Sequence, residues 1–415
     1  MKAKHESMKN HVPNGLLTLA VAALFLTSIA PLVSAGWDCR KPITINNSGD
    51  ALSDYQVLVT LNSSNFDYSK ANPAGSDLRF TDYNNSVSYY YWIETWNITG
   101  TSKIWVNVFS VPSVDSKMYM WYNNPSASSE SDGDVTFVFF DDFEGTSLDT
   151  SKWNVVTNRG ILDLVDGYLR LYRPANMAQE IVSVPSFSGC TIIEYRQKIL
   201  QSNYYYSSVY YGTSPDISSI GYSLYPAYES ALYTGSYKAP LRSGSEPSTG
   251  GDIITDPPVN EWFKEKFIVL PGHISRVLND GGKETSTRYA GVSSGKIGLC
   301  ASSAFSYAME HHTDWIFVRK YTDTEPKIEV SATEDDVTGM VDPVPKLPIP
   351  TYIRDTDTDD DGVPDVWDMD NSTPTEYWTD RQGVGRMWGD MNGDGKLTSV
   401  DALMILQAAA EAINL

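Results

Sequence analysis

The feature that most limits the fold of this chain is a long succession of short runs in which apolar and polar residues alternate. Between residues 37 and 321 these runs are separated by Gly, Pro, Asn and Asp, and helix-period patterns are nearly absent before residue 400. Alternation puts successive side chains on opposite faces of a strand, and the separating residues favour turns. The 26 Tyr and 11 Trp residues favour strands as well. The sequence therefore predicts a mainly β protein made of β-sandwich or jelly-roll domains.

Residues 36–135 form the first expected domain, and its motifs follow a recognisable order. They lie at residues 37–45, 75–82, 91–94, 104–106, 119–125 and 139–143. This order resembles domain-of-unknown-function family 2341 of secreted archaeal and bacterial proteins. The resemblance implies a β-sandwich at the cell surface and no established chemistry. Asp77, Arg79, Asp82 and Glu94 are better explained by a salt-bridged strand end beside an aromatic core than by catalysis.

Residues 136–324 form the second expected domain. It opens with Asp and Trp motifs at residues 140–153 and closes with a Trp-aliphatic strand at residues 314–321. This arrangement resembles concanavalin A-like, laminin-G-like jelly rolls, a fold shared by lectins, glycan-binding modules and glycosidases. Laminarinase-like glycosidases of this architecture carry Glu-x-Asp-x-x-Glu on one strand, and the sequence lacks this pattern. Glu194 stands alone on its strand.

Tyrosines crowd the stretch from residue 204 to residue 237. A tyrosine on a sheet face can stack on a sugar ring while its hydroxyl forms hydrogen bonds. Tyr204, Tyr206 and Tyr211 are therefore candidate glycan-binding residues, and the alternative is that these rings fill the sandwich core. His311 and His312 form a further candidate cluster, for which an exposed loop is favoured over a metal site. Disulfide pairing is left open: Cys190 and Cys300 could pair, which would leave Cys39 over.

Residues 325–354 are rich in proline and predict an extended linker before a small tail, residues 355–415. In the tail, residues 390–401 have the ligand spacing of a calcium-binding EF-hand loop, with Gly395 at its sharp turn. The expected Ca²⁺ ligands are Asp390, Asn392, Asp394, Thr398, Asp401 and the carbonyl of Lys396. A second loop has the same spacing, with Asp357, Asp359, Asp361, Asp365, Asp368 and the carbonyl of Val363. Solvated acidic turns are the alternative for both loops.

The end of the tail predicts one amphipathic helix directly after the loop at residues 390–401. Loop and helix together resemble a type I dockerin repeat, a module that binds cohesin domains. The resemblance implies a cohesin-like partner, contacted through Ser399, Val400 and Leu403. The loop at residues 357–368 is followed by Pro374 instead of a helix, and resembles thrombospondin type 3 repeats.

Residues 1–35 have a basic start, an apolar run and small residues at positions 33–35, which predicts a secretory signal peptide. A retained anchor is the alternative, and no later stretch approaches membrane length. Asn46, Asn62, Asn84, Asn97 and Asn371 begin Asn-x-Ser/Thr triplets, which are compatible with export. The formal net charge of −21 would repel nucleic acid.

The sequence thus favours a secreted, non-catalytic modular protein at the cell surface. Calcium loops in its tail would dock it onto a cohesin-like partner, and its jelly roll would present a surface for glycans. Two alternatives belong to other classes. One is a polysaccharide-degrading glycoside hydrolase, and the other is a calcium-stiffened structural protein of the envelope.

Overall fold

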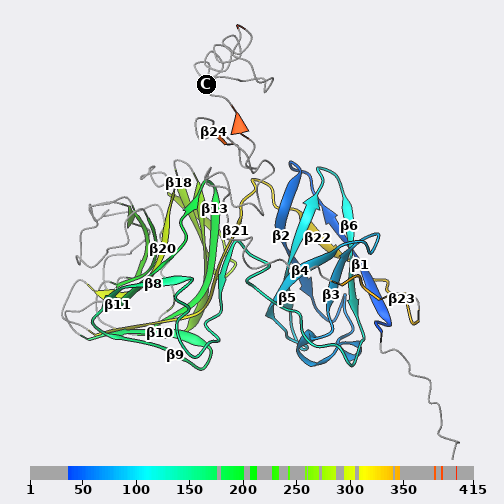
Figure 1. The fold of residues 1–415 in the computed structure, drawn as a ribbon, viewed down its shortest axis with the longest axis horizontal. Coiled ribbons are helices and arrows are strands. Elements are labelled where there is room, and N and C mark those ends of the chain that lie inside the picture. Colours follow the sequence, from blue (N-terminus) through cyan, green and yellow to red (C-terminus); the bar gives the residue numbers. More distant parts are fainter. Residues whose placement is uncertain are drawn as a thin grey trace, which may run out of the picture. The chain divides into compact units, whose positions relative to one another are not determined.

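A computed structural model describes residues 36–174, 179–200, 206–212, 227–232, 242–243, 258, 260–270, 273–286, 294–303, 308–339, 342–345, 378–379, 385–386 and 399. Its regular structure is almost entirely β-strand (Figure 1), so the prediction of a mainly β fold is confirmed. The chain divides into two compact units, the first ending at Val344 and the second starting at Pro345. Within the described residues, no helix has the length and apolar character needed to cross a membrane.

The first sandwich has six strands before residue 123 and two short 3₁₀ helices. These are β1 (Cys39–Asn46), β2 (Leu52–Leu61), η1 (Tyr68–Lys70), η2 (Pro73–Gly75), β3 (Arg79–Asp82), β4 (Ser88–Thr95), β5 (Ser102–Val111) and β6 (Ser116–Tyr122). All neighbouring strands are antiparallel, in the order β2-β5-β4-β3-β6-β1. Alternate side chains such as Ile43, Val57, Val106 and Met120 meet in one buried core, as the alternation predicts.

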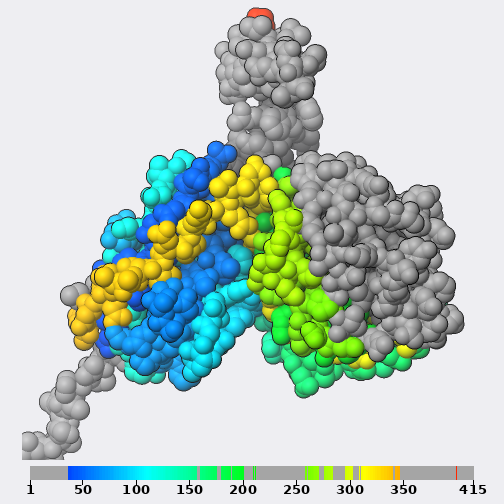
Figure 2. All heavy atoms as spheres, turned by 180° about the vertical axis from the view of Figure 1, so that it is seen from behind, coloured from blue at the N-terminus to red at the C-terminus, as the bar shows by residue number. Residues whose placement is uncertain are grey.

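Two further strands of this sandwich come from the expected linker. β22 (Lys327–Val330) and β23 (Asp335–Asp336) both pair with β1. Ile328 and Val330 pack against the first core, which supplies the physical reason for the pairing. Further along, the backbone N–H of Val344 donates to Oδ1 of Asn85 (3.0 Å). The segment runs along the first sandwich as the yellow band in Figure 2. The prediction of a free spacer beginning at residue 325 is therefore wrong.

The second sandwich consists of two antiparallel sheets. Its strands are β7 (Phe139–Asp141), β8 (Trp153–Asn158), β9 (Ile161–Val165), β10 (Tyr168–Arg173), β11 (Gln179–Ser183), β12 (Phe187–Ser188), β13 (Thr191–Leu200), β14 (Tyr206–Gly212), β15 (Ala227–Leu232), β16 (Arg242–Ser243), β17 (Trp262–Leu270), β18 (His273–Leu278), β19 (Lys283–Ser286), β20 (Ser294–Ser303) and β21 (Met309–Lys320). One sheet has the order β19-β18-β17-β13-β21-β10-β9, with β7 beside β21, and the other has the order β16-β15-β14-β20-β11-β8. Inward side chains of both sheets, such as Phe267 and Leu299, form a single core between them.

The second sandwich is inserted between β6 and β22 of the first, so the chain crosses the junction twice. An aromatic cluster fills this junction, formed by Trp92, Trp105, Phe137, Phe140, Trp315 and Phe317. The rings of Phe137 and Phe317 stack with centroids 4.0 Å apart. The junction is therefore packed like a domain core and is not merely a surface contact.

The second unit is described in only a few places. β24 (Trp378–Thr379) and β25 (Gly385–Arg386) form a two-stranded antiparallel sheet. Ser399 is helical and exposed. Every other residue predicted to bind calcium or a partner in this tail lies outside the described residues, so those assignments stay predictions.

Candidate functional site

A cavity of about 320 Å³ lies where the two sandwiches meet. Its walls come from β4 of the first sandwich, from the segment after β7, and from β13, β17 and β21 of the second. The aromatic and charged residues that line it are Trp92, Glu94, Asp142, Glu144, Arg196, Lys264, Asp314 and Trp315. The cavity thus combines two indole rings with four carboxylates and two cationic groups.

Two β-bulges shape this cavity. In the β4–β5 pair, the register shifts between Ile93 and Thr95, so that Glu94 has no partner residue opposite it. In the β13–β21 pair, Arg196 lies opposite Trp315 and the next residue along lies opposite Thr313, which leaves Asp314 as the extra residue. A bulge re-aims side chains that strict alternation would send to the other face. Consecutive residues of each bulged strand can therefore line the same cavity.

A strained turn supplies the remaining carboxylates. Phe143 is 2% exposed and has a φ of 54°, a left-handed conformation that is rare for a bulky residue. Its backbone N–H donates to Oδ1 of Asp141 (2.9 Å), and Nε1 of Trp153 donates to Oδ2 of the same carboxylate (2.7 Å). These contacts hold a conformation that places Asp142 and Glu144, the residues on either side of Phe143, on the cavity wall.

Glu94 and Asp314, the carboxylates at the two bulges, each form an ion pair with a cation. Nζ of Lys264 lies 2.8 Å from Oε1 of Glu94, and Nε1 of Trp105 donates to Oε2 of that carboxylate (2.9 Å). Burial acts to lower the pKa of Lys264, but the charge and hydrogen bond of Glu94, together with the charges of Asp280 and Glu194, outweigh burial and raise the pKa. Arg196 forms an ion pair with Asp314. Asp142 differs, because burial raises its pKa.

An aromatic cluster extends from the cavity across the outer face of the sheet that contains β17, β13, β21 and β10. The guanidinium of Arg196 lies 4.8 Å from the ring centroid of Trp262. Trp262 makes an edge contact with Tyr168 (centroids 5.6 Å apart), which in turn stacks on His312 (4.5 Å). Nε2 of His312 lies 2.7 Å from Oε1 of Glu310. Tyr168 and Trp262 are both partly exposed, so this face remains open to a ligand.

The histidines correct one prediction. His311 and His312 lie in β21 and not in an exposed loop, and both are buried. His311 points into the second core, where burial lowers its pKa to about 3, whereas His312 is on the outer face. Alternation along the strand separates the two rings. Among the described residues, no group of three or more His, Cys, Asp or Glu side chains is arranged to hold a metal.

Of the predicted glycan-binding tyrosines, Tyr211 does not line this cavity. Tyr211 is completely buried in the second core, and its hydroxyl donates to the carbonyl of Phe187 (2.6 Å), so its assignment as a surface residue is wrong. Tyr206 is the first residue of β14. Tyr204 lies outside the described residues. The alternative interpretation, that tyrosines of this stretch fill the core, holds for Tyr211.

Other residues considered from the sequence have structural roles. Glu194 is buried and paired with Arg319 (2.8 Å), which leaves it no resemblance to a catalytic acid. The carboxylate of Asp77 accepts hydrogen bonds from the backbone N–H groups of Asn72 and Asn123 (2.9 and 2.7 Å). Arg79 pairs with Glu130 (2.9 Å) and not with Asp77.

The cysteines also lie apart. Cys300 packs with Val182, whereas Cys190 packs against a different cluster that contains Ile192. The possible Cys190–Cys300 pair gains no support from this arrangement. Cys39 is buried beside the first core.

Comparisons with known proteins agree with the resemblance of the first domain. Residues 74–156 match the family model of a domain of unknown function (DUF2341), and this range includes Trp92, Glu94, Asp142 and Glu144 of the cavity. Uncharacterized protein MJ1472 of Methanocaldococcus jannaschii is 31% identical over 133 residues, which are 29% of this chain and 24% of that protein. The chain therefore spans about a quarter of the length of the curated relative it matches.

Solved structures with a similar jelly roll include several named as glucanases. A prokaryotic β-1,3-1,4-glucanase (lichenase) from a mouse hindgut metagenome is 16% identical and covers 44% of this chain and 98% of its own, with a TM-score of 0.34. A Bacillus licheniformis β-glucanase is 15% identical over the same shares, also with a TM-score of 0.34. A pseudo β-1,3-glucanase of Mycobacterium tuberculosis is 15% identical, covers 45% and 99%, and has a TM-score of 0.32. No functional conclusion follows from similarity at this level.

Proposed function

We propose that the two sandwiches bind a neutral glycan at the junction cavity and along the adjoining sheet face. The observation that carries this proposal is the convergence of bulged and strained segments from both sandwiches on one cavity, next to an open aromatic face. Bulges and left-handed bulky residues cluster at functional sites because the surrounding fold must hold them in place.

The chemistry of the surface suits sugar rings. Trp262 and Tyr168 offer apolar ring surface for the C–H faces of a pyranose, while Arg196 and Lys264 offer N–H donors to its hydroxyls. The lining carries four carboxylates against two cations. This excess of negative charge would repel uronate or sulfate groups, so the expected ligand is neutral.

The pairing of the carboxylates favours binding over hydrolysis. A glycosidase needs one protonated and one ionised carboxyl group on either side of the scissile bond. Glu94 and Asp314 are each held in an ion pair, with Lys264 and Arg196, so neither carboxyl group is free to contact a scissile bond as the acid. The alternative is a glycoside hydrolase in which Asp142, whose pKa burial raises, serves as the acid. Release of reducing ends from a neutral glycan, lost in Asp142→Asn, would favour that alternative.

Binding can be tested with the full-length protein by titration calorimetry. The probes are neutral hexasaccharides of the cello, laminari and manno series, with an alginate hexasaccharide as the acidic comparison. We expect Trp262→Ala to weaken binding of a neutral probe about tenfold. Tyr83→Ala is the matched control, since Tyr83 is an exposed aromatic residue (46%) outside the cavity that contacts Tyr119 and Lys117 of its own sandwich. Binding of the acidic probe alone, or equal losses in both variants, would contradict the proposal.

The tail forms the second half of the proposed function. Ligand spacing in its loops supports calcium binding, and the dockerin resemblance supports a cohesin-like partner for an exported protein at the cell surface. The chain would thus hold a glycan-binding module at a docking site. A calcium-stiffened structural tail is the alternative, because its loops would bind calcium without any partner.

Docking can be tested by using the full chain to capture proteins from the native envelope fraction, in calcium and in chelator. Wild-type chain should retain a discrete cohesin-like protein only in calcium, and an Asp390→Ala/Asp401→Ala variant should retain none. Capture that is equal in chelator would contradict calcium-dependent docking. Calcium binding by the chain without any capture would favour the structural alternative.

A further inference from the structure

Four of the Asn-x-Ser/Thr triplets lie in described parts of the first sandwich, and their local structures differ. Such a triplet accepts an N-linked glycan only where the asparagine amide can be reached. We propose that Asn62 and Asn97 are N-glycosylated in the exported protein, and that Asn46 and Asn84 are not. This inference is independent of the proposed glycan binding.

Asn62 lies in the loop between β2 and η1, where it is half-buried and is followed by the exposed Ser63 and Ser64. Its Oδ1 accepts hydrogen bonds from the backbone N–H of Ser64 (2.9 Å) and from the Ser64 hydroxyl (2.5 Å). The oxygen end of the carboxamide is therefore turned into the triplet and bonded to the hydroxyl that the motif requires. In the described part of the chain, its Nδ2 donates no hydrogen bond, so the nitrogen is available to react.

Asn97 repeats this geometry in the exposed turn between β4 and β5. The Thr99 backbone N–H and hydroxyl both donate to Oδ1 of Asn97 (3.1 and 3.0 Å). A side chain on Gly100 would begin only 2.6 Å from Nδ2 of Asn97, so the glycine leaves room beside the nitrogen. All three residues of this triplet are exposed.

In the other two triplets, residues that the reaction requires are held in hydrogen bonds or strand pairing. In the hairpin that carries Asn84, the Ser86 hydroxyl donates to Oδ2 of Asp82 (2.7 Å) and is thereby committed to another residue. Asn46 ends β1, where it pairs with Lys327 of β22. The middle residue of its triplet, Asn47, is buried and donates to the carbonyls of Asp50 and Pro112 (both 2.8 Å).

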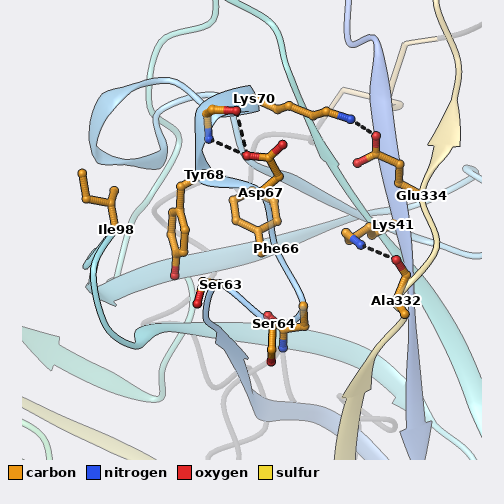
Figure 3. A pocket seen from close by; sticks show the side chains of 12 residues that line it. Lys41, Ser63, Ser64, Phe66, Asp67, Tyr68, Lys70, Ile98, Ala332 and Glu334 are labelled. Carbon is orange, nitrogen blue, oxygen red and sulfur yellow. Dashed lines mark hydrogen bonds and ion pairs between the residues drawn. The ribbon is translucent and has the colours of Figure 1, made fainter.

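The two selected triplets lie on the rim of one cavity. A cavity of about 500 Å³ lies in the first sandwich. Ser63, Ser64 and Ile98 are among the side chains that line it (Figure 3). Ile98 is 63% exposed between Asn97 and Thr99. Glycans on both asparagines would therefore flank this cavity and cover an apolar side chain that the fold leaves in water.

The reaction needs a lipid-diphosphate-linked oligosaccharide as the donor. Nδ2 of the asparagine forms a bond to the anomeric carbon of the donor, and the bond from that carbon to the diphosphate oxygen breaks. The amide nitrogen gives up one proton, and the lipid diphosphate leaves with the electron pair of the broken bond. No oxidation or reduction takes place.

The test is glycopeptide mass spectrometry of the protein isolated from its own organism. We expect glycan mass on the peptides that contain Asn62 and Asn97, and none on those that contain Asn46 and Asn84. Asn62→Gln and Asn97→Gln should each remove one glycan, and the matched Asn84→Gln variant should change nothing. Unmodified peptides at Asn62 and Asn97, or a glycan on Asn84, would overturn the proposal.

Discussion

Arg319 carries a positive charge at the junction, where its side chain is only 1% exposed. Its Nε lies 2.8 Å from Oε1 of Glu194 and its Nη2 lies 2.8 Å from Oε1 of Glu325. Nη1 donates to the hydroxyl of Tyr55 (3.5 Å), and the guanidinium lies 5.0 Å from the ring centroid of Trp105. The last two residues belong to the first sandwich, so this one side chain joins both. Arg319→Met removes the charge and keeps most of the side-chain volume.

The size of the effect follows from which partner stays buried. Glu194 is 6% exposed and would lose the cation it contacts, whereas Glu325 is 48% exposed and would be resolvated. Removing one member of a buried ion pair costs about 3–5 kcal/mol, and an exposed partner adds about 1 kcal/mol at most. We therefore expect a loss of about 3–5 kcal/mol in the free energy of unfolding. A loss of 3 kcal/mol corresponds to a drop of roughly 4–5 °C in Tm for a unit of this size.

Urea and thermal unfolding of the full chain would measure this loss. A second variant separates burial of charge from loss of packing. Glu194→Leu combined with Arg319→Met replaces the ion pair by apolar side chains, which is often neutral or stabilising. We expect the double variant to regain about 2 kcal/mol or more over Arg319→Met. A double variant no more stable than Arg319→Met would refute the argument that the unpaired Glu194 charge causes the loss.

Three further predictions concern buried polar groups. The pKa of His311, about 3 in the native protein, lies below that of the unfolded chain, so its contribution to stability is present above pH 6.5 and is lost as pH falls towards 3. His311→Gln should therefore flatten the acid side of the stability curve by about 1.4 kcal/mol per pH unit in that window. The raised pKa of Asp142 has the opposite sign: its contribution is present at acid pH and lost as pH rises through the native pKa, so Asp142→Asn should stabilise the protein at pH 7 relative to pH 4 in urea unfolding. Tyr211→Phe should cost about 1 kcal/mol in unfolding and leave the affinity for neutral hexasaccharides unchanged, since the ring is internal.

Alternation was enough to predict the strands but not which face of a strand meets water. Tyr211 and Trp262 both belong to alternating aromatic runs, yet Tyr211 is internal and Trp262 lies on the outer face. Which face is outward depends on the pairing of strands that are distant in sequence. The start of β21 was not predicted as a strand, because Met309 is followed by Glu310 and two histidines, which show no apolar alternation.

The sequence did not predict the candidate site for a related reason. A bulge is a one-residue change of register between two strands, and nothing in the residues around Glu94 or Asp314 marks it. β22 is only four residues long, and its partner β1 lies about 280 residues earlier in the chain. Short strands with distant partners carry too little local signal, so the proline-rich composition after residue 340 dominated the prediction.

The insertion of one sandwich into the other explains how a site shared by two domains can keep its geometry. A single covalent connection would leave rotation between the sandwiches restrained by packing alone. Here the chain enters the second sandwich just before Phe137 and Phe140, and leaves it just after Phe317 and Arg319, so that both crossings lie within the packed junction. These two connections oppose rotation of one sandwich against the other. They therefore keep Glu94 of the first sandwich and Asp314 of the second in a fixed relative position. The cavity is therefore shaped before any ligand arrives, which reduces the ordering cost of binding.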